Sequence, residues 1–309
     1  MAFVLVAGQV PAAAGPLRDR LAQRANDRAA AEELDDGVQE GGASRSATLP
    51  AGVRLLRDVA YGPQPRQRMD VYLPAPGAGD KAAVVFLVHG GGWRYGDKAH
   101  SRLVQNKVAR WVPRGVVLVS VNYRMLPEAG PDEQLRDVAR ALAAAQRQAP
   151  SWGADPQRFV TMGHSAGAHL VALLAATPAL AQAQGALPVR GTVALDSAAL
   201  DVPRIMDERH ARLYDQAFGS DPAFWRAVSP VHQLQQPAPP VLAVCSTRRR
   251  VSCDQAQRFA AQGRALGMRV EVLPQDLSHG QVNEQLGLPG AYTDAVEAFM
   301  RSVDSRAFQ

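Results

Sequence analysis

Lysine is scarce in this 309-residue chain: only Lys81, Lys98 and Lys107 occur, so arginine supplies nearly all of the positive charge. The formal net charge is +5, but the basic residues are scattered and interleaved with acidic ones. Residues 248–250 form a basic run, with no aromatic residues alternating with it. Because a nucleic-acid groove needs clustered basic charge, we expect no nucleic-acid partner.

Long apolar runs are missing as well. No run approaches the roughly 18–20 residues of a transmembrane helix, so the sequence predicts no membrane span. The N-terminal stretch 2–8 is apolar but short and lacks a basic region, although Ala12–Ala14 resembles a cleavage site. We interpret residues 1–50 as a mobile lead-in that includes the remnant of an export signal. This interpretation favours a periplasmic or secreted location over a cytoplasmic one.

Cysteine is nearly absent, with only Cys245 and Cys253 in the chain. A disulfide between them would clip one loop and would suit an oxidising compartment. Two reduced, buried thiols are the alternative, and the sequence does not decide between the two states.

Apolar residues make up 47% of the chain, which is enough for a sizeable core. Residues 83–88 form a continuous apolar run, typical of a strand buried on both faces of a parallel sheet. From there, strand-like and helix-like segments alternate to the end. This alternation predicts an α/β fold over residues 51–309: a doubly wound, mostly parallel sheet with helices on both faces. The expected strands are 53–61, 69–73, 83–88, 116–121, 159–162, 193–195, 241–244 and 270–273, and the expected helices include 101–112, 134–149, 255–266 and 291–303.

Residues 201–236 interrupt the alternation. They are rich in Trp, Phe, Tyr, Met and Pro, and they show no regular hydrophobic period. We predict an irregular, lid-like insertion over the catalytic end of the sheet.

The segment Gly163-His164-Ser165-Ala166-Gly167 fits the pattern G-x-S-x-G. Apolar residues of strand length precede it, and an apolar helical stretch follows. In that context the serine sits on a strained strand-to-helix turn that exposes its hydroxyl. The glycines remove the Cβ atoms that would collide as strand and helix close on each other. Ser165 is therefore the candidate nucleophile, and a glycine-rich turn with a capping serine is the alternative.

Three consecutive glycines follow the first buried strand, in His89-Gly90-Gly91-Gly92-Trp93. Their bare N–H groups are suited to stabilising the negative oxygen of a tetrahedral intermediate. We assign Gly91 and Gly92 to this oxyanion hole, with the N–H of Ala166 as the further donor. A flexible loop is the alternative.

A serine hydroxyl needs a base within hydrogen-bond reach. His279 follows the last predicted strand, in a loop that the fold brings over the serine, and it is the candidate base. His169 lies on the helix after the serine and is interpreted as structural. His164 is fixed inside the serine turn; together with Trp93 it is a candidate substrate contact.

These motifs resemble the α/β-hydrolase superfamily, and more narrowly its carboxylesterases with an HGGG-type oxyanion loop, which include feruloyl-esterase-like members. His-Gly-Gly-x-Trp is also similar to the oxyanion motif of kynurenine formamidases. The resemblance implies a Ser-His-acid triad, no cofactor, no metal, and small acyl esters as substrates. The matching segments are Asp70–Pro74, His89–Trp93, Val121–Arg124, Trp152–Pro156 and Gly163–Leu170.

One departure concerns the triad acid. The resemblance implies an acid in the loop after the strand 241–244, but arginine stands in that slot. Asp254 is the nearest carboxylate, and it falls in the first turn of the next helix, where capping is natural. Asp196 ends the preceding strand, as the acid does in some lipases, and a buried carboxylate there needs a partner such as His279. We favour Asp196 and keep Asp254 as the alternative.

The sequence thus predicts a serine carboxylesterase that acts on a small-molecule ester through Ser165, His279 and Asp196. An arylformamidase is the alternative supported by Trp93. A hydrolase-fold protein that binds a ligand without turnover is the alternative outside the enzymes.

Overall fold

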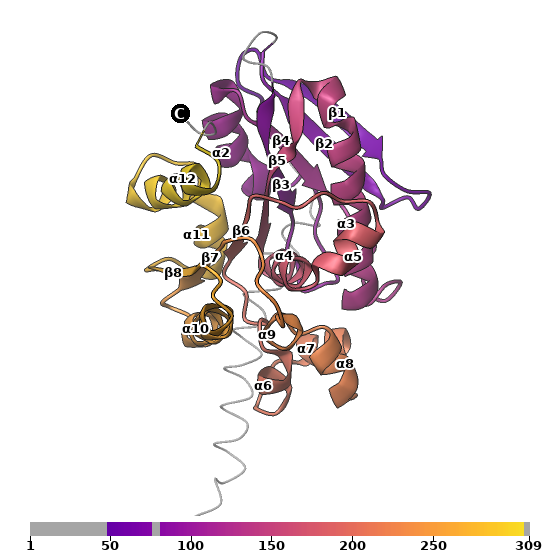
Figure 1. The fold of residues 1–309 in the computed structure, drawn as a ribbon, viewed down its shortest axis with the longest axis vertical. Coiled ribbons are helices and arrows are strands. Elements are labelled where there is room, and N and C mark those ends of the chain that lie inside the picture. The colour runs from indigo at the N-terminus through magenta and orange to yellow at the C-terminus, as the bar shows by residue number, and fades with distance from the viewer. Residues whose placement is uncertain (1–47, 76–80, 306–309) are drawn as a thin grey trace, which may run out of the picture.

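The computed structural model describes residues 48–75 and 81–305, so the predicted lead-in lies outside the described residues except for 48–50. An eight-stranded sheet forms the centre, in the order β1-β2-β4-β3-β5-β6-β7-β8 (Figure 1). β2 pairs antiparallel with both neighbours, and the pairs from β4 to β8 are parallel. The predicted α/β fold with a mostly parallel sheet is confirmed. The strands are β1 (Arg54–Ala60), β2 (Arg68–Leu73), β3 (Ala82–Val88), β4 (Val117–Val121), β5 (Ala154–His164), β6 (Gly191–Leu195), β7 (Val241–Ser246) and β8 (Val270–Gln275).

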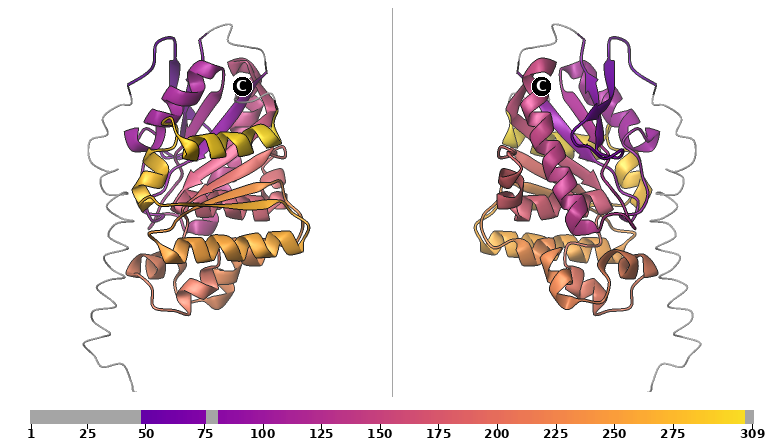
Figure 2. Two further views of the ribbon diagram at one scale, coloured as in Figure 1. Left: turned by 90° about the vertical axis from the view of Figure 1, so that its left-hand side faces the viewer. Right: turned by 90° about the vertical axis from the view of Figure 1, so that its right-hand side faces the viewer.

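Alternate residues of the central strands pack against helices on opposite faces of the sheet. On β3, Val84 and Phe86 join the apolar cluster that contains α3 and α4, whereas Val85 and Leu87 join the cluster that contains α2 and α12. Figure 2 shows α12 from one side of the molecule and α3 from the other. Because helices cover both faces, the strand is apolar at every position. The larger helices are α2 (Ser101–Trp111), α3 (Pro131–Gln148), α4 (Ala166–Ala176), α10 (Arg250–Ala265) and α12 (Ala291–Val303).

Residues 201–236 are not irregular, and that part of the prediction was wrong. They form four short helices, which follow β6 and lie together at one end of the molecule (Figure 1). Three of these helices carry proline in the first turn, where its missing N–H costs nothing. The helices are α6 (Val202–Met206), α7 (Arg212–Phe218), α8 (Pro222–Ala227) and α9 (Pro230–Gln233).

The remaining helical elements are short connections. α5 follows α4, and α11 follows β8. The two 3-10 turns, η1 and η2, each precede a strand of the sheet. Their bounds are η1 (Val112–Arg114), η2 (Ala149–Trp152), α5 (Pro178–Ala183) and α11 (His279–Glu284).

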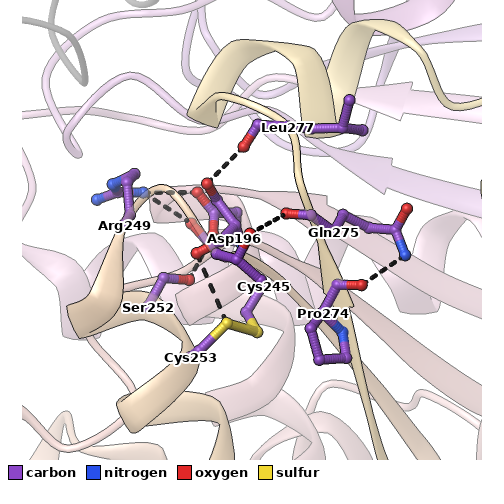
Figure 3. The surroundings of a disulfide bond; sticks show 10 residues. Asp196, Cys245, Arg249, Ser252, Cys253, Pro274, Gln275 and Leu277 are labelled. Atoms are coloured by element: carbon purple, nitrogen blue, oxygen red, sulfur yellow. Dashed lines mark hydrogen bonds and ion pairs between the residues drawn. A yellow bond between two sulfur atoms is a disulfide. The ribbon is translucent and has the colours of Figure 1, made fainter.

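Cys245 on β7 and Cys253 on α10 form a disulfide, so the bridged alternative holds in this structure (Figure 3). The bridge ties the end of a central strand to the first turns of the following helix. It lies beside the carboxyl end of β6, where Asp196 is found.

No helix among the described residues has the length and hydropathy to cross a bilayer. Within the same ranges, no group of three or more His, Cys, Asp or Glu side chains is arranged to hold a metal ion.

Candidate active site

Ser165 lies at the turn between β5 and α4. Its backbone angles are φ 56° and ψ −119°, a conformation that non-glycine residues rarely adopt. Its N–H donates to the carbonyl of Leu195 at 2.9 Å, which ties the turn to the end of β6. A serine held in a strained turn at the carboxyl end of a central strand is typical of a nucleophile elbow.

Close packing explains the two glycines of this elbow. A Cβ on Gly163 would lie 2.3 Å from the carbonyl oxygen of Gly167, on the first turn of α4. A Cβ on Gly167 would lie 2.3 Å from the carbonyl oxygen of Val88, at the end of β3. The predicted close approach of strand and helix is therefore confirmed at Gly163, and at Gly167 the close neighbour is the adjacent strand.

The glycine loop after β3 runs beside Ser165. A Cβ on Gly90 would lie 2.8 Å from the Cβ of Ser165. Among the described residues, the N–H groups of Gly91, Gly92 and Ala166 form no hydrogen bond. They therefore remain able to donate to a substrate oxygen, as an oxyanion hole requires.

His279 begins α11, and its imidazole reaches the carboxyl end of β6. Its Nδ1 lies 2.6 Å from Oδ2 of Asp196, and both side chains are buried. Its Nε2 is also buried and forms no hydrogen bond with any described residue. Nδ1–H can therefore donate to Asp196 while Nε2 accepts a proton, as a triad base must. Contacts between nucleophile and base are often long before substrate binds.

The Asp196 carboxylate accepts hydrogen bonds at both oxygens. Oδ1 accepts from the backbone N–H of Ser246 at 2.6 Å and from the hydroxyl of Ser252. Oδ2 accepts from His279 and from Nη1 of Arg249, the latter at 2.7 Å (Figure 3). Burial alone would raise the pKa of Asp196, but these hydrogen bonds and the charge of Arg249 lower it well below its usual range. Asp196 is therefore charged at neutral pH.

Two interactions hold the backbone of His279 in place. Ser278 caps α11 in a capping box with Gln281, which fixes the backbone at the base. Nε2 of His164 lies 3.0 Å from the carbonyl oxygen of His279. Burial, and the positive charge that His279 carries when protonated, lower the pKa of His164 well below its usual value, so its neutral ring donates there through Nε2–H. The side chain of His164 is buried, and its role as a substrate contact stays a prediction.

Trp93 is buried under α7, where its ring lies 4.9 Å from that of Phe218. Its indole N–H donates to Nδ1 of His169 at 3.1 Å, and Nε2 of His169 lies 2.7 Å from the carbonyl oxygen of Val228. Because indole only donates, the proton of His169 is on Nε2. Burial lowers the pKa of His169 to about 4, so the ring stays neutral. The chain of contacts joins the oxyanion loop to α4 and to the end of α8, and the role of Trp93 toward substrate stays a prediction.

Asp254, the alternative acid, lies on α10 with its side chain 65% exposed. Its nearest cation is Arg250, at 3.8 Å. The neighbouring disulfide does not turn this carboxylate toward His279. Of the two candidate acids, the structure brings Asp196 to the base.

Comparison with known protein families adds a direct assignment. The model of the BD-FAE family matches residues 69–262, which is more than half of the chain. The chain belongs to the BD-FAE family.

Known relatives of this BD-FAE protein include esterases and a formamidase. Isoprenylcysteine alpha-carbonyl methylesterase of Arabidopsis thaliana is 28% identical over 239 residues, which cover 71% of this chain and 55% of that protein. Kynurenine formamidase of Danio rerio is 31% identical over 150 residues, which cover 48% of this chain and 46% of that protein. The chain therefore spans about half the length of these relatives.

Among solved structures, esterase B from Lactobacillus rhamnosis superposes with a TM-score of 0.72. The match covers 93% of this chain and 96% of that chain, at 19% identity. At this identity the likeness concerns the fold, and it shows that the BD-FAE protein has the α/β-hydrolase fold.

Arg249, like the Asp196 partners Ser246 and Ser252, is a residue of the site to which the sequence assigned no role. Its Nη1 lies 2.7 Å from Oδ2 of Asp196 and 2.5 Å from Nδ1 of His279. Both nitrogens direct hydrogen atoms at the same carboxylate oxygen, so arginine and imidazole share it. The available signal was the arginine run in the slot where the family resemblance implies an acid. Arg249 brings a positive charge to His279 at that point.

Gly91→Ala is expected to lower kcat by a factor of roughly 10²–10³, the usual effect of losing one oxyanion donor. Gly91 has φ 103°, and an added Cβ would lie 2.4 Å from the backbone carbonyl oxygen of Tyr95. The loop must shift to relieve this clash, and its N–H groups shift with it. Steady-state ester hydrolysis and a thermal melt of the same sample measure the two effects.

Gly153→Ala is the matched control for the backbone strain. Gly153 also has a positive φ, 75°, but an added Cβ there meets nothing within 4 Å. We expect this variant to lose about 1 kcal/mol of stability, with kcat within twofold of wild type. Equal loss of kcat in both variants would show that backbone strain, and not oxyanion geometry, limits turnover.

Proposed function

We propose that this BD-FAE protein is a serine carboxylesterase that hydrolyses small acyl or aryl esters through an acyl-enzyme. The contact of 2.6 Å between His279 and Asp196, at the same sheet edge as the strained Ser165, is the observation that carries the proposal. The methylesterase relative supports the proposed type of reaction, because its name describes the hydrolysis of an ester.

In the proposed reaction, Oγ of Ser165 attacks the ester carbonyl while Nε2 of His279 takes its proton. The carbonyl oxygen becomes negative and receives hydrogen bonds from the N–H groups of Gly91 and Ala166. The proton on His279 then moves to the leaving alcohol as its bond to carbon breaks. Water attacks the acyl-enzyme by the same route, and the acid leaves with Ser165 restored.

We further propose that residues 201–236 act as a lid-like insertion. Two rings of α7, Tyr214 and Phe218, pack on Trp93 of the oxyanion loop. His169 connects the same loop to Val228. Changes in these helices would therefore reach the oxyanion loop through packed side chains.

Arylformamidase activity is the second candidate. It is favoured by the presence of Trp93 after the glycine loop and by the similarity to kynurenine formamidase over 150 residues. The two reactions share nucleophile, base and oxyanion hole, so substrate preference has to separate them.

A panel of 4-nitrophenyl esters of increasing chain length, measured beside N-formylkynurenine, tests the proposed function. We expect kcat/KM for the acetate or butyrate ester to exceed that for the formamide by about tenfold or more, an advantage of ~1.4 kcal/mol or more in transition-state binding. The reverse order would support the formamidase. Absence of turnover together with failure to react with a fluorophosphonate would support a ligand-binding protein.

A further inference from the structure

A cavity of about 670 Å³ adjoins the candidate active site, between the helices α6 and α7 and the first half of α10. More of the charged side chains in its walls are positive than negative. Two carboxylates, of Glu208 and Asp254, face it together with the imidazole of His210. The arginines of the walls are Arg204, Arg209, Arg248, Arg249, Arg250 and Arg258.

The long ion pairs of Arg250 and Arg258 leave N–H donors for another anion. Arg250 lies 3.8 Å from Asp254, and Arg258 lies 3.8 Å from Asp201. Arg204, Arg248 and Arg249 are paired more closely, with Glu208, Asp276 and Asp196. A guanidinium has five N–H donors, and a carboxylate engages two of them in a fork. Arg250 and Arg258 can therefore donate to a further oxyanion without breaking their existing pairs.

Arg249 links the cavity to the candidate catalytic groups. This side chain lines the cavity, and it also contacts the Asp196 carboxylate and the His279 ring. Ala198, two residues after Asp196, lines the cavity as well. An anionic group in the cavity would therefore lie beside the triad on the side of its acid.

The charge of Arg249 also bears on the chemical step. His279 takes up a positive charge when it accepts the proton of Ser165, and a like charge nearby disfavours that state. Asp196 offsets this effect, but it shares its Oδ2 between both groups. A negative group placed near Arg249 would offset it further, so an anionic substrate would be favoured in turnover as well as in binding.

We propose that this cavity receives a carboxylate of the substrate, so that the enzyme prefers esters that carry a negative charge near the scissile bond. The inference rests on the proposed esterase function for its catalytic part. The binding of a carboxylate to the arginine-lined cavity is independent of it.

Two matched pairs of esters test the preference. On the acyl side, mono-4-nitrophenyl glutarate is compared with 4-nitrophenyl pentanoate. On the alcohol side, 4-carboxyphenyl acetate is compared with 4-carbamoylphenyl acetate. In at least one pair we expect kcat/KM for the anionic ester to exceed that for the neutral ester by about tenfold, the effect of one added hydrogen bond to a charged group. We expect high salt to remove this preference, because it screens the charges. A preference for the neutral ester in both pairs would overturn the proposal.

Variants on opposite walls test whether the preference for anionic esters arises in this cavity. Arg209→Gln and Arg250→Gln, combined, are expected to reduce the ratio of anionic to neutral kcat/KM by roughly tenfold. Arg136→Gln is the control, because Arg136 forms an exposed i,i+4 pair with Asp132 outside the cavity, like that of Arg250 with Asp254. An equal change of the ratio in the control would contradict the assignment.

Calorimetry with glutarate and the Ser165→Ala protein separates the two proposals. We expect glutarate to bind, and to bind about tenfold more weakly when Arg209 and Arg250 are replaced. Ester hydrolysis without glutarate binding would overturn the cavity assignment and leave the esterase intact. Glutarate binding without hydrolysis of any ester would support the cavity and reject the esterase. Tighter binding of inorganic phosphate than of glutarate would overturn the choice of carboxylate.

Discussion

Ser165→Ala is expected to lower ester turnover by a factor of about 10⁶ and to leave the protein folded. The hydroxyl is the group that would form the acyl-enzyme, and alanine offers no nucleophile in its place. Oγ of Ser165 forms no hydrogen bond within the part of the chain that the structure describes, so its removal orphans no partner. Rates from a nitrophenyl ester assay and the thermal melting curve give the two measurements.

Ser197→Ala is the matched control. Ser197 is also buried at this edge of the sheet, and its hydroxyl accepts a hydrogen bond from the N–H of Ala199 at 3.1 Å. We expect its turnover to stay within a few-fold of wild type, although it loses about 1 kcal/mol of stability with that hydrogen bond. A fluorophosphonate should label wild type and Ser197→Ala but not Ser165→Ala. Retention of a tenth of wild-type turnover in Ser165→Ala would exclude this serine as the nucleophile.

The sheet could be predicted from the sequence because its central strands are buried on both faces. The runs at 83–88 and 241–244 are apolar at every position, and both lie within observed strands. The start of β5 was missed because Asp155, Gln157 and Arg158 are polar and Pro156 interrupts them. That part of the strand pairs little with its neighbours, so burial gives it no pattern.

The helices of residues 201–236 were missed for a different reason. Each has four to seven residues, too few for a helical period to appear in the hydrophobic pattern. Local signals were present nevertheless. Asp201 and Asp221 cap two of these helices through their side chains, and a proline follows within the first turn of each.

The candidate site was only partly predictable. Ser165 and the glycine loop stand in motifs that carry their own backbone geometry, so the sequence alone predicts their roles. Arg249 could not be assigned in this way, because its contacts with Asp196 and His279 depend on the direction of a long side chain. The choice between two aspartates likewise depends on which one the fold turns toward His279.

Asp196→Asn is therefore the second variant with a large expected effect, a loss of turnover of about 10⁴ with little change in KM. An asparagine amide can donate a hydrogen to Nδ1 of His279, which moves the ring proton to Nε2. In that tautomer the ring cannot accept the proton of Ser165. The substitution also removes the negative charge that offsets Arg249 beside the imidazole. Circular dichroism and the melting temperature establish that the variant is folded.

Asp254→Asn is the matched control and the test of the alternative acid. Its exposed pair with Arg250 is expected to contribute at most about 1 kcal/mol, so turnover should stay within twofold. If the pattern were reversed, with Asp254→Asn crippled and Asp196→Asn active, the acid would be Asp254 on α10, some residues beyond the slot that the family resemblance implies. If neither variant lost more than about tenfold, far short of the ~10⁴ expected for a triad acid, His279 would work without one. In that case Asp196 would serve to hold Arg249 and the β7–α10 connection, and catalysis would rest on a Ser165–His279 dyad.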